Sequence, residues 1–466
     1  MTARGEPPVR PMSGVDCAWL RMDEPTNLMI INGIMMFDAP LDPHRLTGMV
    51  RQRLARIPRF RDRAVQRGRI RWGWRRDENF DVDRHLVEEE LPEPGGDREL
   101  EELVSGHMNE ALPFDRPLWR IHLIHGYGGG SALLWRLHHC IGDGIALMVL
   151  LLALADLEPD ADLRTDGGGL WGNDNPLSEL FGEEPLEPEE AYEHLEELLP
   201  QGARLLTKPA EVLGSVHPWM LRLAAVPAFL KLALRPRDTR TPLRGPLSRG
   251  KRVAWSRGIP LETIQIARQR LGGTVNDVLL TAFSGGARRY LRDEGFDVED
   301  LNFRAVVPVS LRPVEEMAEL GNEFGLVFLS LPVGIRDPGE RLHELRRRMG
   351  KLKRSVEPWV VLKLLGIIGC LPRFLQDLVV RIFGSKGTAV VTTVPGPTRQ
   401  LYMAGQPIRD FVFWVPQSGR LGMGVSTMSY AGEVRLGVAT DVDLVSEPAR
   451  IVAGFEEELE EMIAGS

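Results

Sequence analysis

An abrupt change of charge near the middle of the chain most constrains the fold, because it divides the sequence into two halves. Residues 157–200 carry fourteen acidic residues and one arginine, whereas residues 201–252 carry eleven lysines and arginines and two acidic residues. Such a segment is typical of an acidic, solvated connection followed by a basic amphipathic helix. A chain of 466 residues is also long for one hydrophobic core. We therefore predict two domains, residues 1–157 and 252–466, joined by residues 158–251.

Strand-like and helix-like segments occur in both halves, which predicts an α/β fold with mixed sheets flanked by helices. In the first half we expect a strand at 28–37 and a helix at 42–54. A hairpin that turns at "GGG" is expected at 118–139, and a buried apolar helix at 145–157. In the second half we expect helices at 260–272, 274–295 and 446–465, and strands at 302–311, 325–334, 388–396, 410–416, 421–430 and 433–440.

Composition excludes several classes of protein. The formal net charge of −8 argues against a broad nucleic-acid-binding surface. The three cysteines have no CxxC spacing, which fits a reducing cytosol and predicts neither a disulfide framework nor a cysteine-rich zinc site. The N-terminus lacks the apolar run of a secretory signal, and charged residues and a proline interrupt the longest apolar stretch, residues 358–383. We expect a protein that is soluble or rests on a surface.

Two adjacent histidines, His138 and His139, end the second strand of the predicted hairpin in the segment "RLHHCIGDGIALM". Successive side chains of a strand point to opposite faces, so these two imidazoles cannot both bind one ion. No HExxH, no CxxC and no downstream carboxylate cluster completes a zinc site. The sequence therefore predicts no metal.

A catalytic base, by contrast, needs one imidazole at the exposed end of a rigid element and a neighbour that fixes its tautomer. Here the strand ends at His139, Gly142 and Gly144 permit a sharp turn, and Asp143 returns close to the strand end. The residues alone leave two interpretations open. His139 is either a base, or a structural histidine with Asp143 as a turn or cap residue.

Residues 138–144 match the HHxxxDG signature of CoA-dependent acyltransferases and peptide-synthetase condensation domains. Other motifs stand in the expected order, namely "MSGVDCAWLRMDEPTNLM", "RPLWR", "TVNDVLL", "VVPVSLRP" and "TTVPGP". Together they resemble the bacterial wax ester synthase/diacylglycerol acyltransferase family over nearly the whole chain. Two departures are Gly14–Val15, where the family often has Pro–Leu, and Thr393, where Asn is common.

The resemblance implies two chloramphenicol-acetyltransferase-like domains with an active-site tunnel between them. It also implies transfer of a fatty acyl group from acyl-CoA to a long-chain alcohol or diacylglycerol, giving wax ester or triacylglycerol, with no cofactor beyond the acyl-CoA substrate. His139 would be the general base beside His138, because an alcohol is a poor nucleophile until a base takes its proton. Similar folds use the motif aspartate structurally, so Asp143 would brace the site, with Arg312 as the expected partner.

The remaining site residues follow from the same motifs. Asn276 is the candidate donor to the oxyanion of the tetrahedral intermediate, although "TVND" also reads as a helix cap in which Asp277 is structural. The PLW residues Pro117, Leu118 and Trp119 would shape a wall near the site. Pro395 and Gly396 are expected to form a turn after a strand, and this turn would line the tunnel.

The implied substrates are lipids, so we expect peripheral contact with a membrane or lipid-body surface, in a cytoplasmic protein on the inner face of the cell membrane. Basic amphipathic segments at 218–237 and 351–375 could make that contact or could pack on the core. Two alternatives stay open, a condensation-like acyltransferase with a carrier-bound donor and a noncatalytic lipid-binding protein. The sequence does not rank wax ester against triacylglycerol.

Overall fold

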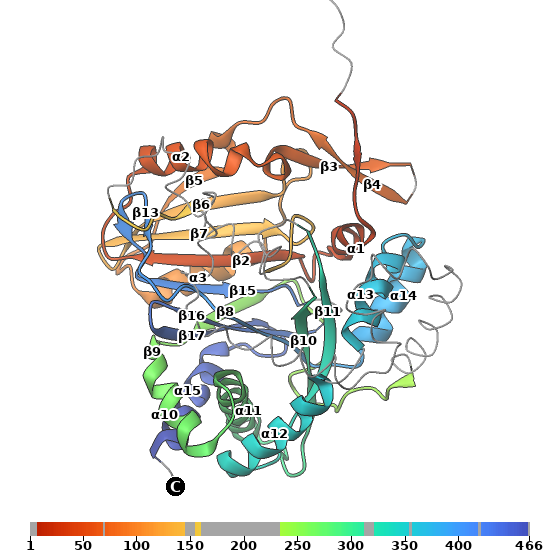
Figure 1. Ribbon diagram of the computed structural model, residues 1–466, viewed down its shortest axis with the longest axis vertical. Helices are drawn as coiled ribbons and strands as arrows, with labels where there is room; N and C mark the ends of the chain where they lie inside the picture. The colour runs from red at the N-terminus through yellow and green to blue at the C-terminus, as the bar shows by residue number, and fades with distance from the viewer. Residues whose placement is uncertain are drawn as a thin grey trace, which may run out of the picture.

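The computed structural model describes residues 7–68, 70–144, 154–159, 234–311, 321–353, 357–417 and 421–464. Two β-sheets lie at its centre, one above the other in Figure 1. The upper sheet has the strand order β15-β2-β7-β6-β5, and its strands are β2 (Ile30–Phe37), β5 (Leu86–Glu90), β6 (Trp119–Tyr127), β7 (Gly130–His138) and β15 (Asp410–Trp414). The lower sheet has the order β11-β10-β12-β16-β17-β8, with β9 beside β17. Its strands are β8 (Lys251–Trp255), β9 (Ile259–Pro260), β10 (Phe303–Ser310), β11 (Phe324–Leu331), β12 (Ala389–Val394), β16 (Met423–Tyr430) and β17 (Glu433–Asp441).

The predicted first-half strands are confirmed, and their sequences explain their burial. Every residue of β2 and of β7 is buried, which fits strands covered on both faces. The hairpin between β6 and β7 turns at Gly128 and Gly129, both with positive φ, a conformation that glycine adopts without steric cost. The strand β7 ends at His138, one residue earlier than predicted.

Strand β15 crosses from the second half of the chain into the sheet of the first half. The segment 410–416 was expected as a strand, and in the structure Asp410–Trp414 pairs antiparallel with β2, Phe411 opposite Met35 and Val412 opposite Ile34. The carbonyl oxygen of Phe413 accepts a hydrogen bond from the Ser426 hydroxyl on β16. One strand therefore joins the two halves through backbone pairing.

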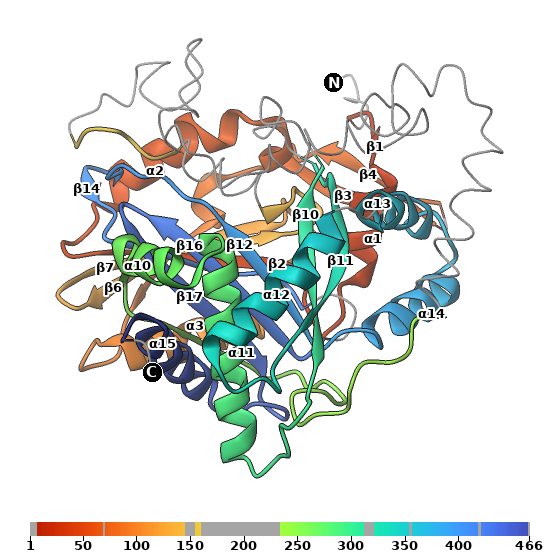
Figure 2. The same cartoon turned by 60° about the horizontal axis from the view of Figure 1, so that its bottom comes forward.

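Helices cover the outer faces of the sheets. Figure 2 shows α10, α11, α12 and α15 together at one side, and α13 and α14 beside α1 at one edge. The helices are α1 (Gly14–Met22), α2 (Pro43–Gln52), α3 (Asp97–Met108), α10 (Leu261–Leu271), α11 (Val275–Asp293), α12 (Pro338–Lys353), α13 (Glu357–Ile368), α14 (Arg373–Gly384) and α15 (Pro448–Ala464). The predicted helices of the second half match α10, α11 and α15. Most of the predicted helix at 145–157 lies outside the described residues.

Some small elements were not predicted. A three-stranded sheet has the order β1-β4-β3 and a two-stranded one pairs β13 with β14; their strands are β1 (Arg10–Pro11), β3 (Asp62–Arg67), β4 (Arg71–Arg76), β13 (Tyr402–Met403) and β14 (Gln406–Pro407). Short 3-10 turns are found at Leu54–Arg56, Pro58–Arg61 and Val82–Arg84.

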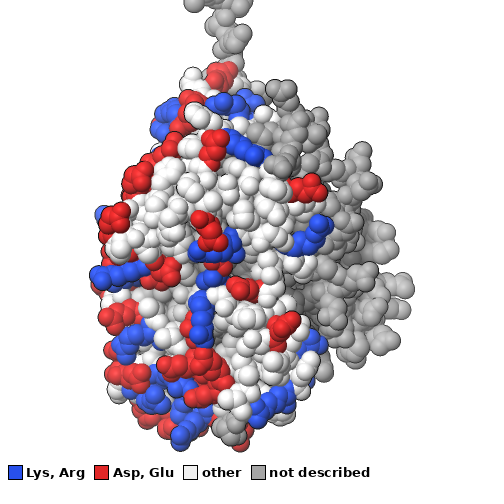
Figure 3. Space-filling model, turned by 90° about the vertical axis from the view of Figure 1, so that its left-hand side faces the viewer, with Lys and Arg blue, Asp and Glu red and all other residues white. Residues whose placement is uncertain are grey.

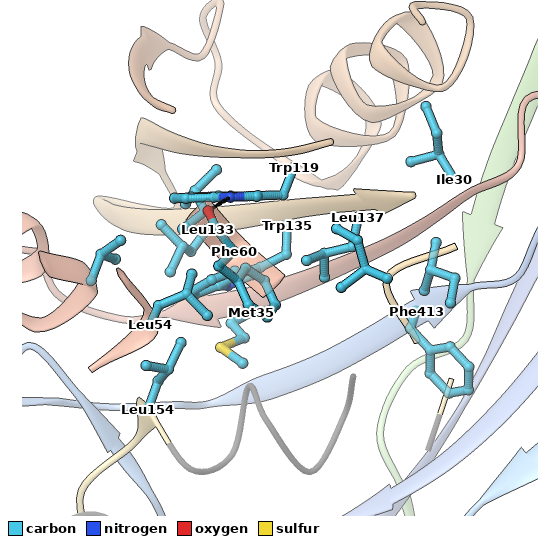
Figure 4. Close-up of a cluster of buried hydrophobic side chains, with 14 of the residues drawn as sticks. Ile30, Met35, Leu54, Phe60, Trp119, Leu133, Trp135, Leu137, Leu154 and Phe413 are labelled. Carbon is cyan, nitrogen blue, oxygen red and sulfur yellow. Dashed lines mark hydrogen bonds between the residues drawn. The ribbon is translucent and has the colours of Figure 1, made fainter. Parts of the chain in front are cut away.

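Two tryptophans of the upper sheet, Trp119 of β6 and Trp135 of β7, lie in one apolar cluster. Figure 4 shows Trp119 and Trp135 there with Phe60, Leu133 and Leu137, all buried. The indole Nε1 of Trp119 donates a 2.9 Å hydrogen bond to the carbonyl of Phe60, so this polar atom is satisfied inside the core. The last residue of the PLW segment, Trp119, is thus a core residue, and it pairs with Leu137 of β7.

Charges of both signs are interspersed on the face shown in Figure 3. Within the part of the chain that the structure describes, no helix combines the length and the apolar character that crossing a bilayer requires. Most of the predicted basic amphipathic segment at 218–237 lies outside the described residues, whereas most of 351–375 is described and belongs to α12, α13 and the start of α14.

Candidate active site

The imidazole of His139 lies at the junction of the two halves. His139 directly follows β7, and its backbone N–H donates to the carbonyl of Met29 at 2.8 Å. Its ring stacks on Trp19 of α1, with ring centroids 4.0 Å apart and planes at 11°. Phe324, the first residue of β11, packs 5.6 Å away. Aromatic walls from both halves therefore hold this ring in one plane.

Asn322 fixes the tautomer of His139. Nδ1 of His139 lies 2.9 Å from the Asn322 amide oxygen, and the amide nitrogen donates to Asp16 Oδ1 at 2.8 Å and to the carbonyl of His139 at 2.9 Å. A carboxylate and a carbonyl only accept, so the amide nitrogen must face them and the amide oxygen must face the imidazole. Nδ1 therefore carries the hydrogen, and Nε2 keeps a free lone pair. That is the arrangement of a base.

Burial sets the charge of these groups. Removal from water lowers the pKa of His139 to about 4, so the imidazole is neutral at pH 7. Burial raises the pKa of Asp16, while the guanidinium of Arg59, 3.5 Å away, opposes this shift. Asp16 is 3 % exposed. Its carboxylate contacts the guanidinium of Arg59 on one side and accepts a hydrogen bond from the Asn322 amide on the other.

His138 belongs to a different environment. Its Nδ1 accepts the backbone N–H of Cys140 at 3.1 Å, and its Nε2 lies 3.8 Å from Asp23 Oδ1. Burial lowers the pKa of His138 to about 3 and raises that of Asp23 to about 6. The ring of His138 packs against the edge of Phe114, whereas His139 stacks on Trp19. As expected, the two imidazoles have separate partners.

Asp143 braces the segment that carries Asn322. Its backbone N–H donates to the carbonyl of Gly321 at 3.0 Å, and its carboxylate Oδ2 accepts the backbone N–H of Glu323 at 3.3 Å. These two residues flank Asn322, so the motif aspartate acts on the base through the residue that orients it. Gly142 is buried and Gly144 half-buried, and neither has the positive φ of a left-handed turn. Arg312, the expected partner of Asp143, lies outside the described residues.

Asn276 is the second residue of α11, in the second half of the chain. Its amide oxygen accepts a 2.8 Å hydrogen bond from the Thr393 hydroxyl, which itself accepts one from Thr427 at 2.8 Å. The departure at Thr393 thus has a role, because its hydroxyl orients the Asn276 amide. No contact between Asn276 and His139 is found in the described structure. The neighbouring Asp277 caps α11 instead, since its carboxylate accepts from both the backbone N–H and the hydroxyl of Thr274.

The other motif residues are structural in the described contacts. Pro117, Leu118 and Trp119 are buried, and the carbonyl of Leu118 accepts the backbone N–H of His138 at 3.0 Å. Pro395 and Gly396 directly follow β12 but lie outside regular secondary structure, and the first bend comes at Thr398–Arg399, two residues later than the expected turn. A side chain at Gly396 would meet the carbonyl of Ser429 at 2.0 Å, so this position requires glycine.

One cluster could offer ligands to a metal. Glu89, His107 and His122 have ligand atoms within 4.8 Å of one another. The two histidines already bond to the Glu89 carboxylate, at 2.9 Å from His107 and 2.5 Å from His122, which explains their approach as a hydrogen-bonded group. In the described structure no contact joins this cluster to His139.

The sequence prediction missed Asn322, Asp16 and Trp19 as site residues. Asp16 and Trp19 lie in the N-terminal motif, which was used for the resemblance without roles for its residues. Asn322 stands 183 residues after His139, and the short stretch "GNEFG" carries no pattern that marks it.

A buried histidine at the junction of two α/β halves, in the segment with the HHxxxDG signature, fits the class that comprises CoA-dependent acyltransferases and condensation domains. Comparisons make this more specific. Residues 12–279 match the family model "Wax ester synthase/diacylglycerol acyltransferase catalytic domain", and residues 320–463 match "WS/DGAT C-terminal domain". The chain belongs to the wax ester synthase/diacylglycerol acyltransferase family and is an acyltransferase.

Known proteins agree with this assignment. The chain is 28% identical to a putative diacylglycerol O-acyltransferase of Mycobacterium bovis over 396 residues, which cover 84% of this chain and 81% of the relative. It superimposes on the wax ester synthase/diacylglycerol acyltransferase of Marinobacter aquaeolei VT8 with a TM-score of 0.69 and 22% identity, covering 97% of this chain and 98% of the other. The first condensation domain of the calcium-dependent antibiotic synthetase gives 0.60 at 17% identity, covering 98% and 96%. The predicted fold is confirmed.

Proposed function

We propose that the enzyme transfers a fatty acyl group from acyl-CoA to the hydroxyl of a long-chain alcohol or of diacylglycerol, forming wax ester or triacylglycerol. The family assignment supports this reaction rather than the condensation-like and noncatalytic alternatives. One observation carries the mechanism. The Asn322 amide oxygen accepts a hydrogen bond from Nδ1–H of His139, so the neutral imidazole keeps its Nε2 lone pair free to accept a proton.

In the proposed mechanism, Nε2 of His139 removes the proton from the acceptor hydroxyl as its oxygen attacks the thioester carbonyl carbon. The C–S bond then breaks, the ester carbonyl re-forms, and the proton passes from the imidazolium to the CoA sulfur. No acyl-enzyme is required. Burial raises the pKa of the Cys140 thiol well above its ordinary value, which argues against this cysteine as a nucleophile.

Asn276 is our candidate for the oxyanion donor. Thr393 occupies its amide oxygen, which leaves the amide nitrogen as the group that can donate. Hydrogen bonds aimed at the developing negative charge are worth about 10²–10³ in rate per donor. The tunnel between the halves and the peripheral position at a membrane or lipid body are parts of the same proposal, because both substrates carry long apolar chains.

The test is release of free CoA thiol from palmitoyl-CoA with hexadecanol or dioleoylglycerol as acceptor. His139→Asn keeps a donor toward Asn322 but removes the base, and we expect at least about a 10²-fold loss of acceptor-dependent release. His85→Asn is the matched control, because His85 is also buried, stacks on a tryptophan at 4.2 Å, and has a pKa lowered to about 4.

Wild-type rates in a folded His139→Asn variant would remove His139 as the base. Absence of thiol release by the wild type with either acceptor would contradict the proposed reaction itself. The better acceptor decides between wax ester and triacylglycerol synthesis.

A further inference from the structure

Exposed apolar side chains gather on α13 and α14. In the described part of the chain, six large apolar side chains are exposed, and three of them lie on this pair of helices: Ile367 (51 %), Phe374 (69 %) and Leu378 (50 %). The other three, Phe114, Leu234 and Ile266, lie on separate parts of the fold. The turn between the two helices adds Cys370, the exposed one of the three cysteines of the chain. We call Ile367, Cys370, Phe374 and Leu378 the apolar tip.

Cationic side chains border the apolar tip. Lys363, Arg373 and Arg381 are exposed, and Lys363 precedes Ile367 by four residues, one turn along the same face of α13. The one acidic residue on α14, Asp377, is only half-exposed. This face is therefore apolar at its centre and positive at its rim, unlike the mixed charges of the face in Figure 3. A second copy of the same face would meet it with like charge, which disfavours self-association.

Helices α13 and α14 pack against α1, the helix whose Trp19 stacks on His139. A side chain at Gly14 of α1 would lie 2.3 Å from the carbonyl oxygen of Gly366, and one at Gly369 would lie 1.7 Å from that of Gly14, so only glycines allow α1 and α13 to approach this closely. Arg21 donates to the carbonyls of Gly369 and Leu371 at 3.2 and 2.7 Å.

Gln376 of α14 adds a third tie, donating to the carbonyl of Ala18 on α1 at 3.1 Å. The same helix α1 carries Trp19, which stacks on His139, and Asp16, which holds Asn322. One helix thus separates the apolar tip from the imidazole.

We infer that the apolar tip and its cationic rim dock the enzyme onto an anionic lipid surface. The inference rests on the proposed function, whose acceptor is dissolved in such a surface. Apolar side chains enter the boundary between headgroups and acyl chains, while lysine and arginine attract anionic headgroups. Docking here brings the lipid phase to the edge of the molecule where α1 supports the base.

Cys370 allows a direct test on the complete protein, since Cys17 and Cys140 are buried. An environment-sensitive fluorophore is attached to Cys370 and titrated with vesicles of phosphatidylglycerol and phosphatidylcholine in equal parts. We expect a blue shift, quenching by lipids that carry a quencher in the acyl chain, and weaker binding at 0.5 M salt or with phosphatidylcholine alone. The matched probe is Ile266→Cys in a Cys370→Ser background, which places the label at an exposed site on α10 and is expected to show no quenching.

Two variants separate docking from chemistry. Phe374→Ser with Leu378→Ser should weaken vesicle binding at least about tenfold, because two exposed apolar side chains that would enter the lipid are lost. This variant should lose CoA release with dioleoylglycerol in vesicles but keep it with a short-chain alcohol in solution. Ile266→Ser is the control and should change neither.

An unquenched label at Cys370 together with wild-type vesicle binding by the double variant would overturn the docking surface, as would concentration-dependent dimerisation that buries the label. If vesicles bind as expected but no acceptor supports CoA release, the proposed function fails and the docking surface stands. The two failures are thus distinguishable.

Discussion

The base owes its properties to three side chains that hold it. Trp19 fixes the ring plane, Asn322 fixes the tautomer, and Asp16 fixes Asn322. Of these three, the two side chains that contact the imidazole, Trp19 and Asn322, carry no charge. The Asn322 amide lies between His139 and the carboxylate of Asp16. The environment therefore keeps His139 neutral rather than stabilising its cation, which differs from a His–Asp pair.

The first prediction concerns pH. A histidine with an ordinary pKa of about 6.5 loses its basic form below pH 6.5, whereas the pKa of His139 is lowered to about 4 by burial. We expect kcat/KM to stay level from pH 7 down to about pH 5. A fall centred near pH 6.5 would contradict this assignment. Burial raises the pKa of Asp23 to about 6. A fall of kcat/KM near pH 6 that disappears in Asp23→Asn would therefore belong to Asp23 and not to His139.

The same shift predicts a loss of stability in acid. The unfolded chain binds a proton at His139 below about pH 6.5, but the folded protein does so only near pH 4. The unfolded state thus binds more protons in this window, so the stability contribution of the neutral imidazole is complete above pH 6.5 and is lost as pH falls toward 4. It amounts to roughly 3 kcal/mol. His139→Asn should make urea unfolding less dependent on pH between 6.5 and 5, with His343→Asn as an exposed control.

Asn322 is a positioning residue, and its substitution should separate orientation from folding. Asn322→Ala removes the acceptor of the Nδ1 hydrogen and should lower kcat at least about tenfold. Asn322→Asp places a carboxylate at Nδ1, raises the pKa of His139, and should move the acid limb of kcat/KM upward. A merely structural role would leave the position of that limb unchanged in both variants.

Part of this site follows from sequence. The motif locates His139 and Asp143 because their spacing is local and the strand end is readable. Asn322 comes from a distant loop, and only the packing of the two halves brings it to the imidazole. The role of Asp143 was expected as a brace, but its contacts with the residues flanking Asn322 depend on that same packing.

At the scale of elements, α1 is the joint between the base and the rest of the molecule. Ser13 caps it, accepting the N–H of Asp16 at 3.0 Å, so its first turn places Asp16 toward Asn322. Gly14, the departure from the family pattern, faces the carbonyl of Gly366. In this chain a glycine–glycine contact sets the distance between α1 and α13.

Gly14→Ala should therefore displace α1. The added methyl group would lie 2.3 Å from a backbone oxygen, so we expect a loss of about 1–3 kcal/mol in unfolding free energy and a lower kcat through Trp19. Gly106→Ala is the control, because Gly106 is exposed in α3 with nothing within 4 Å of the new methyl group, and alanine there should stabilise the helix by about 0.5–1 kcal/mol. Urea unfolding and CoA release measure both. Equal effects of the two substitutions would refute the role given to the contact.

At the scale of the whole molecule, alternation of strands and helices predicted an α/β fold of two halves, and most strands lie where hydrophobic runs placed them. The strand 410–414 was recognised, but its sheet was not. Its residues are apolar on both faces, a pattern that fits a buried strand in either sheet. Pairing partners are set by long-range packing, which no local pattern encodes. The domain limits near residues 157 and 252 stay predictions.

Because β15 pairs with β2 while packing on β16 and β17, the two halves should unfold together. We expect one calorimetric transition with equal calorimetric and van't Hoff enthalpies, and equal exchange free energies for amides of β7 and β16. Gly437→Ala tests this at the contact, since a methyl group there would lie 2.9 Å from the carbonyl oxygen of Phe413. It should destabilise both sheets by the same amount, about 1–3 kcal/mol, while Gly350→Ala, with nothing within 4 Å, should not. If only the β16 amides lose protection, the halves fold independently, and the site at their junction is assembled by docking rather than by a shared strand.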